Sequence, residues 1–332
     1  MASRDRPIVI AHRGASGYLP EHTLESKTLA HALGADFLEQ DLVLSGDGIP
    51  LVLHDLSLDA VTDVATRYPG RARGDGHWYA IDFTWEELSI LRVRERLDPR
   101  SGRPAFPDRT QSWSLEGQSP FRLHTLDQEL TLIRGLNRTR GQESGIYVEI
   151  KEPAWHATLG GDLTAAALAV LERHGYLEAG ERIFIQCFDP HCLRRVHGLA
   201  PQVPLIQLVG EPGWWPRAPA DFATMRTPAG LAQVRRYAAG LGPWIGHLVS
   251  QTGPDERPRF TDLVELAHRA GLLVHPYTLR RDALPHGFST LDSLLGTLLD
   301  LGIDGIFTDF PDLAVRCRDA WCERHGGAHP SP

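Results

Sequence analysis

The feature that most constrains the fold is a regular alternation, along nearly the whole chain, of short apolar runs and amphipathic segments. The apolar runs are rich in β-branched residues, which is typical of buried strands. Eight runs have this character, namely Ile8–Ala11, Phe37–Leu44, Ile146–Ile150, Ile183–Phe188, Leu205–Val209, Ile245–Ser250, Leu272–Tyr277 and Gly305–Thr308. Strands that alternate with helices pair in parallel, and eight such strands close a (β/α)8 barrel. We therefore expect an α/β fold of the TIM-barrel type.

Between the apolar runs, apolar residues recur at three- and four-residue steps, the period of an amphipathic helix. The clearest helical segments are Leu24–Leu33, Leu163–Arg173, Asp262–Ala270 and Leu291–Leu301. Thr125 with Gln128 predicts a capping box, and Pro190 and Pro311 are expected in first helical turns. A doubly wound open sheet is the alternative, but it would usually carry a glycine-rich turn for a nucleotide, which this sequence lacks.

One long segment breaks this alternation. From about residue 59 to residue 122 the sequence is rich in glycine, arginine, proline and aromatic residues, and its one clear helix signal is Thr84–Glu87, leading into Leu88–Val93. Such a stretch is too long for an ordinary barrel connection. We therefore expect one barrel domain over residues 7–325, with a subdomain over residues 59–122 inserted after the second strand. Long barrel loops usually shape the mouth of an active site.

The composition excludes several classes of protein. The 332 residues include 34 Lys and Arg against 42 Asp and Glu, a net charge of −8. Because the sequence also lacks a clustered basic face, we expect no binding to nucleic acid. It contains no apolar run of about 18 residues, so we expect no transmembrane segment. The spacings of the four cysteines fit neither a zinc site nor a redox pair, so free thiols are expected.

The N-terminal residues 1–7 lead directly into the first predicted strand and contain no apolar signal-peptide segment. We therefore expect a cytoplasmic protein as the sequence stands, and a periplasmic or secreted one if a leader precedes it. Both a monomer and a dimer are compatible with the sequence.

Polar residues gather at the carboxyl ends of the first three predicted barrel strands, where TIM-barrel active sites lie. They are His12 and Arg13 after the first strand, Glu39 and Asp41 in the second, His54 after a short extended segment that follows it, and Glu149 and Lys151 in the third. Side chains alternate along a strand, so Glu39 and Asp41 share one face, as do Glu149 and Lys151. If these faces point inward, three carboxylates converge with four basic side chains.

This set of residues indicates metal-assisted cleavage of a phosphodiester. Three carboxylates cannot all stay charged in one dry pocket unless a cation binds between them, and oxygen ligands select Ca²⁺ or Mg²⁺ over zinc. Arg13 and Lys151 suit phosphate oxygens, and two imidazoles suit a general acid and a general base. Each residue alone has a structural explanation, but none explains why polar residues interrupt three strands at alternating positions.

Several motifs resemble the glycerophosphodiester phosphodiesterase family, and the similarity covers nearly the whole chain. The motifs are Ile10–Thr23, Leu38–Asp41, Val52–Asp55, Tyr147–Lys151 and Gly305–Asp309. His22, where most family members have asparagine, and the long insertion that begins near Val61–Val64 resemble the bacterial periplasmic branch. That branch is secreted, which contrasts with the absence of a leader in this sequence.

The resemblance implies an enzyme that hydrolyses glycerophosphodiesters, the deacylated phospholipids, to sn-glycerol 3-phosphate and an alcohol. By matching motif, it implies acid–base roles for His12 and His54, phosphate binding by Arg13 and Lys151, and one divalent cation, typically Ca²⁺ with Mg²⁺ as the alternative, held by Glu39, Asp41 and Glu149.

Four further residues have two possible roles each. Gln186 and Phe188 match family positions that line the substrate site, and both would equally fit the core. Tyr277 is a candidate of the same kind. Asp309 ends one of the motifs and would also fit a helix cap.

Two other functions remain open. A phospholipase D acting on lysophospholipids or sphingomyelin would use a similar barrel with similar histidines. It would need an apolar surface for membrane docking, for which Trp214 and Trp215 are candidates. A catalytically inactive glycerophosphodiester-binding protein would be expected to lack a histidine or a metal ligand, and none is missing here.

Overall fold

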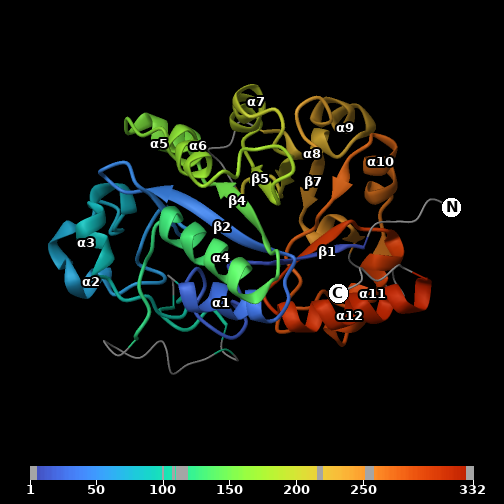
Figure 1. Ribbon diagram of the computed structural model, residues 1–332, viewed down its shortest axis with the longest axis horizontal. Coiled ribbons are helices and arrows are strands. Elements are labelled where there is room, and N and C mark those ends of the chain that lie inside the picture. The colour runs from blue at the N-terminus through green and yellow to red at the C-terminus, as the bar shows by residue number, and fades with distance from the viewer. Residues whose placement is uncertain are drawn as a thin grey trace.

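The computed structural model describes residues 6–98, 101–106, 109, 119–214, 220–250 and 258–326. Its centre is a barrel of parallel strands surrounded by helices (Figure 1). The barrel strands are β1 (Ile8–Ala11), β2 (Phe37–Leu44), β4 (Gly145–Ile150), β5 (Ile183–Cys187), β6 (Leu205–Val209), β7 (Gly240–Pro243), β10 (Leu273–Val274) and β11 (Gly305–Thr308). Their order is β10-β7-β6-β5-β4-β2-β1-β11.

Backbone hydrogen bonds close the barrel between its first and last strands in this order. The amide of Asp304 donates to Val274 at 3.0 Å, and the amide of Leu279 donates to Phe307 at 2.8 Å. The predicted (β/α)8 barrel is therefore confirmed, and the doubly wound open sheet is excluded.

Helices that alternate with these strands cover the outside of the barrel. They are α1 (Leu24–Ala32), α4 (Leu126–Arg140), α6 (Leu163–Arg173), α7 (Pro190–Leu199), α9 (Pro228–Val234), α10 (Leu263–Arg269), α11 (Leu291–Leu301) and α12 (Pro311–His325). The shorter helices α5 (Pro153–Thr158) and α8 (Phe222–Met225) lie in loops. The predicted capping box is present at Thr125, and Pro190 and Pro311 occupy first turns as expected.

The predicted strand Ile245–Ser250 is wrong. Residues Ile245–His247 form a 3-10 turn, and β8 (Val249–Ser250) pairs antiparallel with β9 (Arg259–Phe260) away from the barrel sheet. The barrel strand at this point of the chain is β7, which lies a few residues earlier.

Strand β7 was missed because its sequence, Gly-Leu-Gly-Pro, resembles a turn. Its glycines are needed for close packing against β6. A Cβ at Gly240 would lie 2.6 Å from Ile206 Cδ1, and one at Gly242 would lie 2.6 Å from Leu208 Cδ2. Tertiary packing therefore overrides local strand propensity here.

The side chains inside the barrel form layers. Ile10, Phe37, Tyr147, Ile206 and Phe307 make a buried apolar cluster, in which the Tyr147 and Phe307 rings meet edge to face at 4.9 Å. Residues two positions further along a strand point into the same interior. The next layer therefore begins with polar residues, because glutamates follow both Phe37 and Tyr147 at this spacing.

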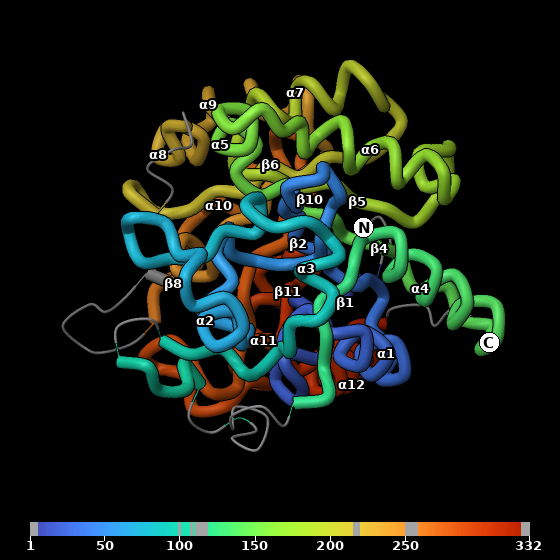
Figure 2. Tube along the Cα trace, turned by 90° about the vertical axis from the view of Figure 1, so that its left-hand side faces the viewer, coloured from blue at the N-terminus to red at the C-terminus, as the bar shows by residue number. Residues whose placement is uncertain are grey.

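The segment between β3 (Pro50–Val52), which pairs antiparallel with β2, and α4 has a hydrophobic cluster of its own. It contains α2 (Val64–Arg67) and α3 (Trp85–Ser89). Strand β2 points toward these two helices in Figure 1, and both lie in front of β2 in Figure 2. The predicted insertion 59–122 falls here, although residues 99–100, 107–108 and 110–118 lie outside the described residues.

Helix α3 begins after Thr84, where the helix signal was recognised, and Thr84 and Glu87 form a capping box, but the helix is shorter than predicted. It ends at Ser89, and residues 92 and 93 instead form β-bridges with Arg122 and Thr62.

None of the described helices is both long and apolar enough to cross a membrane. All four cysteines are free, as the sequence indicated.

Candidate active site

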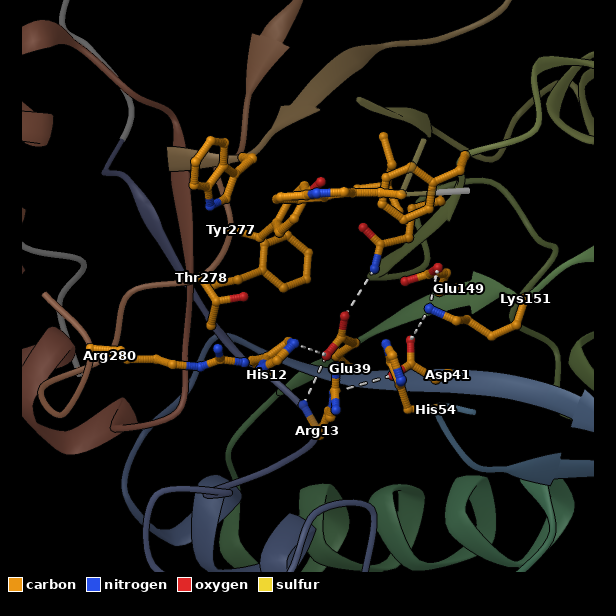
Figure 3. A pocket seen from close by; sticks show the side chains of 17 residues that line it. His12, Arg13, Glu39, Asp41, His54, Glu149, Lys151, Tyr277, Thr278 and Arg280 are labelled. Carbon is orange, nitrogen blue, oxygen red and sulfur yellow. Dashed lines mark hydrogen bonds and ion pairs between the residues drawn. The ribbon is translucent and has the colours of Figure 1, made fainter. Parts of the chain in front are cut away.

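A cavity of about 390 Å³ opens at the carboxyl ends of the barrel strands (Figure 3). All ten residues that the sequence singled out for the site line it, namely His12, Arg13, Glu39, Asp41, His54, Glu149, Lys151, Gln186, Phe188 and Tyr277. The remaining lining residues are Leu208, Trp214, Trp244, Thr278, Arg280, Ala283 and Phe307. Trp214, considered for a membrane-docking surface, thus faces this cavity, whereas Trp215 lies outside the described residues.

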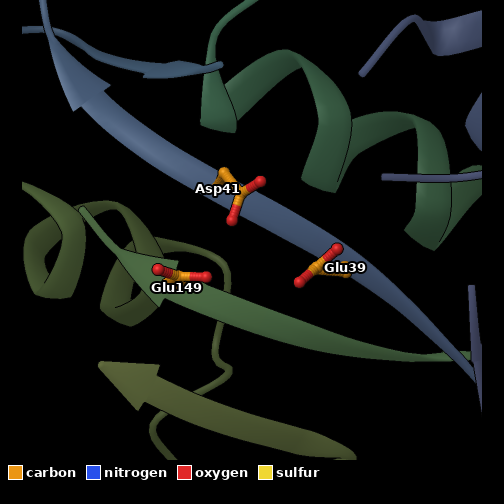
Figure 4. A group of neighbouring side chains, drawn as sticks. All are labelled: Glu39, Asp41 and Glu149. Atoms are coloured by element: carbon orange, nitrogen blue, oxygen red, sulfur yellow. The ribbon is translucent and has the colours of Figure 1, made fainter. Parts of the chain in front are cut away.

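Three carboxylates meet on one side of this cavity (Figure 4). One oxygen atom from each of Glu39, Asp41 and Glu149 lies within 4.8 Å of the other two, and all three side chains are buried. Burial, together with repulsion from its two neighbours, raises the pKa of Glu39 well above its usual value. Burial likewise raises the pKa of Glu149 to about 8. A shared cation would relieve this repulsion.

Glu39 is held by two hydrogen bonds. Gln186 Nε2 donates to its Oε1 at 3.0 Å, and the backbone amide of Arg13 donates to its Oε2 at 2.8 Å. Gln186 therefore lines the cavity and contacts one of its three carboxylates. Tyr277 lines the cavity with its ring, while its hydroxyl donates to the backbone oxygen of Val209 at 2.9 Å.

The other two carboxylates have basic partners. Lys151 Nζ lies 2.7 Å from Glu149 Oε1, and His22 Nε2 lies 2.7 Å from Asp41 Oδ2. Burial alone would raise the pKa of Asp41, but Lys151 and His22 hold it well below its usual range. The other oxygen of Asp41, Oδ1, is buried and has no hydrogen-bond partner among the described residues. An oxygen of this kind is suited to a metal ion.

Each of the two histidines is held by an aspartate. His12 Nδ1 donates to Asp309 Oδ1 at 2.6 Å, and His54 Nδ1 donates to Asp55 Oδ1 at 2.5 Å. Nδ1 of each ring is thus occupied, and Nε2 of His12 lies 3.9 Å from Glu39 Oε2. Burial lowers the pKa of His12 to about 4 and that of His54 to about 3, so both rings are neutral near pH 7.

Asp309 is therefore not a helix cap. Helix α12 has Phe310 at its N-cap position, and the Asp309 side chain points to His12 instead. Its second oxygen, Oδ2, accepts hydrogen bonds from Arg109 at 2.5 Å and from Arg280 at 2.8 Å. Burial would raise the pKa of Asp309, but Arg280 and His12 hold it well below its usual range.

The arrangement also contains residues that the sequence did not single out. Asp55 directly follows His54 in a motif, so its position beside a histidine was a usable signal. Arg96 and Arg109 had no such signal, because they come from the predicted insertion and reach partners far away in the sequence.

Comparison with known proteins agrees with this geometry. The glycerophosphoryl diester phosphodiesterase family matches residues 12–313 of the chain. The chain belongs to this family. Among family members, a glycerophosphodiester phosphodiesterase of Haemophilus influenzae is 40% identical over 326 residues, which covers 93% of this chain and 88% of that protein. One from Treponema pallidum is 38% identical and covers 93% and 91%.

Solved structures show the same fold. A Silicibacter pomeroyi protein superposes with a TM-score of 0.67 at 26% identity, covering 96% of this chain and 95% of that one. An Oleispira antarctica phosphodiesterase, solved with sn-glycerol-3-phosphate, has a TM-score of 0.65 at 23% identity and covers 94% and 97%. Membership of the glycerophosphoryl diester phosphodiesterase family confirms the enzyme class that the motifs indicated, a phosphoric diester hydrolase.

Proposed function

We propose that the protein hydrolyses glycerophosphodiesters to sn-glycerol 3-phosphate and an alcohol, using one divalent cation and two histidines. The observation that carries this proposal is the convergence on one cavity of three carboxylates, the basic side chains of Arg13 and Lys151, and two aspartate-bound histidines. A cavity of about 390 Å³ suits a small polar molecule. The names of the relatives at 38–40% identity support the same substrate class.

Glu39, Asp41 and Glu149 would hold the cation. The buried oxygen of Asp41 that accepts no hydrogen bond from the described residues fits this role, as do the raised pKa values of both glutamates. Because all the ligands are oxygens, we propose Ca²⁺, with Mg²⁺ as the alternative. When bound, such a cation withdraws charge from the phosphoryl oxygens.

Arg13 and Lys151 would bind the phosphate, and His12 and His54 would transfer protons. A phosphodiester anion in the cavity favours the protonated form of a histidine that it contacts, which opposes the effect of burial. One histidine would then start as the acid while the other, neutral, starts as the base.

The substrate carries its own nucleophile, the glycerol hydroxyl next to the phosphorylated oxygen. As the oxygen of this hydroxyl bonds to phosphorus, the hydroxyl proton passes to Nε2 of the histidine that acts as the base. The acidic histidine protonates the departing alcohol as the bond from phosphorus to that alcohol breaks. Water then opens the cyclic phosphate with the two roles reversed, so both histidines return to their starting states. Because the hydroxyl is held beside the phosphorus, no protein nucleophile is needed.

The deciding experiment is an assay of glycerophosphocholine hydrolysis coupled to detection of glycerol 3-phosphate. We expect turnover that excess EDTA abolishes and added Ca²⁺ restores. Failure of the wild-type protein to release glycerol 3-phosphate would overturn the function. Faster release of choline from lysophosphatidylcholine would favour a phospholipase D, and binding without turnover a binding protein. Full activity in EDTA, with no metal in the purified protein, would refute the proposed role of the cation and leave the rest of the proposed function unaffected.

A substrate analogue with hydrogen in place of the neighbouring hydroxyl tests the reaction path. We expect it to bind as a competitive inhibitor and scarcely to react. Hydrolysis at a rate close to that of the natural substrate would instead support direct attack by water, and the metal and histidine assignments would be unaffected.

A further inference from the structure

Arg96, in the insertion, reaches the barrel and binds two carboxylates at once. Its Nη1 donates to Asp55 Oδ2 at 2.6 Å, while Nε and Nη2 donate to the two oxygens of Glu21 at 2.9 and 2.6 Å. Its side chain is 16% exposed. Three N–H groups of one guanidinium are thus used on two separate carboxylates, a geometry that a planar fork allows and an ammonium does not.

Each of these carboxylates holds a residue that lines the cavity. Both oxygens of Glu21 accept from Arg13 Nη1 at 3.0 Å, and Asp55 Oδ1 accepts from His54 Nδ1 at 2.5 Å. Glu21 and Asp55 themselves are absent from the cavity wall. Arg96 therefore lies one layer behind the cavity wall, where it contacts the two carboxylates that hold Arg13 and His54.

We propose that Arg96 is a positioning residue that orients Arg13 through Glu21 and His54 through Asp55. This inference rests on the proposed function, since it concerns the phosphate-binding arginine and an acid–base histidine. Without Arg96, the Asp55 carboxylate would lose the guanidinium at its Oδ2 and would keep the contact of its Oδ1 with His54 Nδ1. Glu21 loses two of its hydrogen bonds. The His54 ring and the Arg13 guanidinium would then each sample several orientations.

The charges in this cluster agree with that role. Burial alone would raise the pKa of Asp55, but Arg96 and His54 hold it well below its usual range. Arg13 and Arg96 together do the same for the pKa of Glu21. Both carboxylates thus stay ionised as fixed acceptors. The insertion then contributes to catalysis itself, in addition to covering one side of the barrel mouth.

The competing explanation is that Arg96 only fastens the insertion to the barrel. Arg96→Lys separates the two, because it keeps the charge and loses the fork. Arg94→Lys is a matched control in the same segment, since Arg94 donates to the backbone oxygen of Asp59 at 3.0 Å and lines no part of the cavity. We expect Arg96→Lys to lower kcat for glycerophosphocholine by about 100-fold with a smaller change in KM, and Arg94→Lys to leave both near wild type.

Chemical rescue gives a second readout, which a fastening role would not produce. In Arg96→Ala, added guanidinium ion is expected to bind between Glu21 and Asp55 and restore kcat by about 10-fold or more, at concentrations that leave wild type unchanged. Should Arg96→Ala fail to fold, the comparison of Arg96→Lys with Arg94→Lys decides the question. If Arg96 acts on His54 through Asp55, the double variant Arg96→Lys/Asp55→Asn will lose less activity than the two single losses combined.

A folded Arg96→Lys variant with wild-type kcat would overturn the inference. So would losses of activity that merely follow the fraction of folded protein in both the Arg96 and Arg94 variants, with no rescue by guanidinium. A wild-type protein without activity on glycerophosphocholine would overturn the proposed function, and this inference with it. The two failures are therefore distinguishable.

Discussion

Lys27 and Lys151 are the only two lysines in this sequence, although it contains 34 lysines and arginines in total. Both are buried, and both contact strand β2, Lys27 at the backbone oxygen of Glu39 and Lys151 at the side chain of Asp41. Lys151 faces the cavity, whereas Lys27 Nζ donates to the backbone oxygen of Glu39 and to Glu129 Oε1 behind the strand. Glu129 also accepts from His124 Nε2 at 2.5 Å. The compact ammonium of Lys27 thus ties β2, which carries two of the three clustered carboxylates, to α4.

We predict that Lys27→Met destabilises the fold by about 3 kcal/mol near pH 7. Burial alone would raise the pKa of Glu129, but Lys27 and His124 lower it from 4.5 to about 2. A lowering of this size, to which His124 also contributes, corresponds to about 3 kcal/mol of stability. Removal of one partner of a buried ion pair typically costs about 3–5 kcal/mol, which is consistent with that value. Because the pKa is lower in the folded state, this stabilisation is present above about pH 4.5 and is lost as pH falls toward 2.

The assay is urea denaturation of the wild type and the variant at pH 7, and at pH values from 5 downward. We expect the difference between them to narrow as pH falls below 4.5. Arg173→Met is the control, since Arg173 makes an exposed ion pair with Asp127 at 3.1 Å and its loss should cost less than about 1 kcal/mol. A loss of less than about 1 kcal/mol for Lys27→Met at pH 7 would refute the reasoning.

Three further predictions follow from the site and its surroundings. Glu149→Gln should raise the Ca²⁺ concentration needed for half-maximal activity of EDTA-treated enzyme, because an amide binds a hard cation more weakly; an unchanged titration would remove Glu149 from the ligand set. His54→Ala should lower kcat by about 10²- to 10⁴-fold with an unchanged melting temperature, and a near-normal kcat would assign His54 to structure. Burial lowers the pKa of His156 to about 4, and neither ring nitrogen has a partner among the described residues. The wild type should therefore lose stability as pH falls from 6.5 toward 4, and His156→Leu should reduce that loss in thermal melts; an equal slope for both proteins would contradict this.

The fold was predictable where each element carries a local signal. Helices such as α6 and α11 match their predicted bounds because their apolar periodicity agrees with their packing. Strand β7 was not predictable in this way, because glycine has a low strand propensity. Its glycines are required by close packing against the side chains of strand β6. The early end of α3 at Ser89 was not predictable either. The residues that follow it form β-bridges with Thr62 and Arg122, which lie far from it in the sequence.

The three carboxylates of the cavity wall were predictable from alternation along the strands, and the layer of residues behind them was not. Alternation along β2 and β4 places Glu39, Asp41 and Glu149 on one side of the interior, so their convergence needed only the barrel geometry. Their orientation depends on pairs far apart in the sequence, such as His12 with Asp309, which are separated by 297 positions.

The backbone beneath the first motif shows why its residues need one another. Arg13 has a left-handed φ of 59°, and its amide then donates to Glu39 Oε2 at 2.8 Å. Gly14 follows with a φ of 93°, where a Cβ would lie 2.9 Å from the backbone carbon of Ser26 and 2.5 Å from its Oγ, so only glycine fits. A left-handed conformation is unfavourable for arginine, and it persists because the carboxylate of Glu39 accepts the amide that it exposes. The turn and the cluster of carboxylates therefore stabilise each other, and a sequence pattern records the residues of such a turn without recording the partner that holds it.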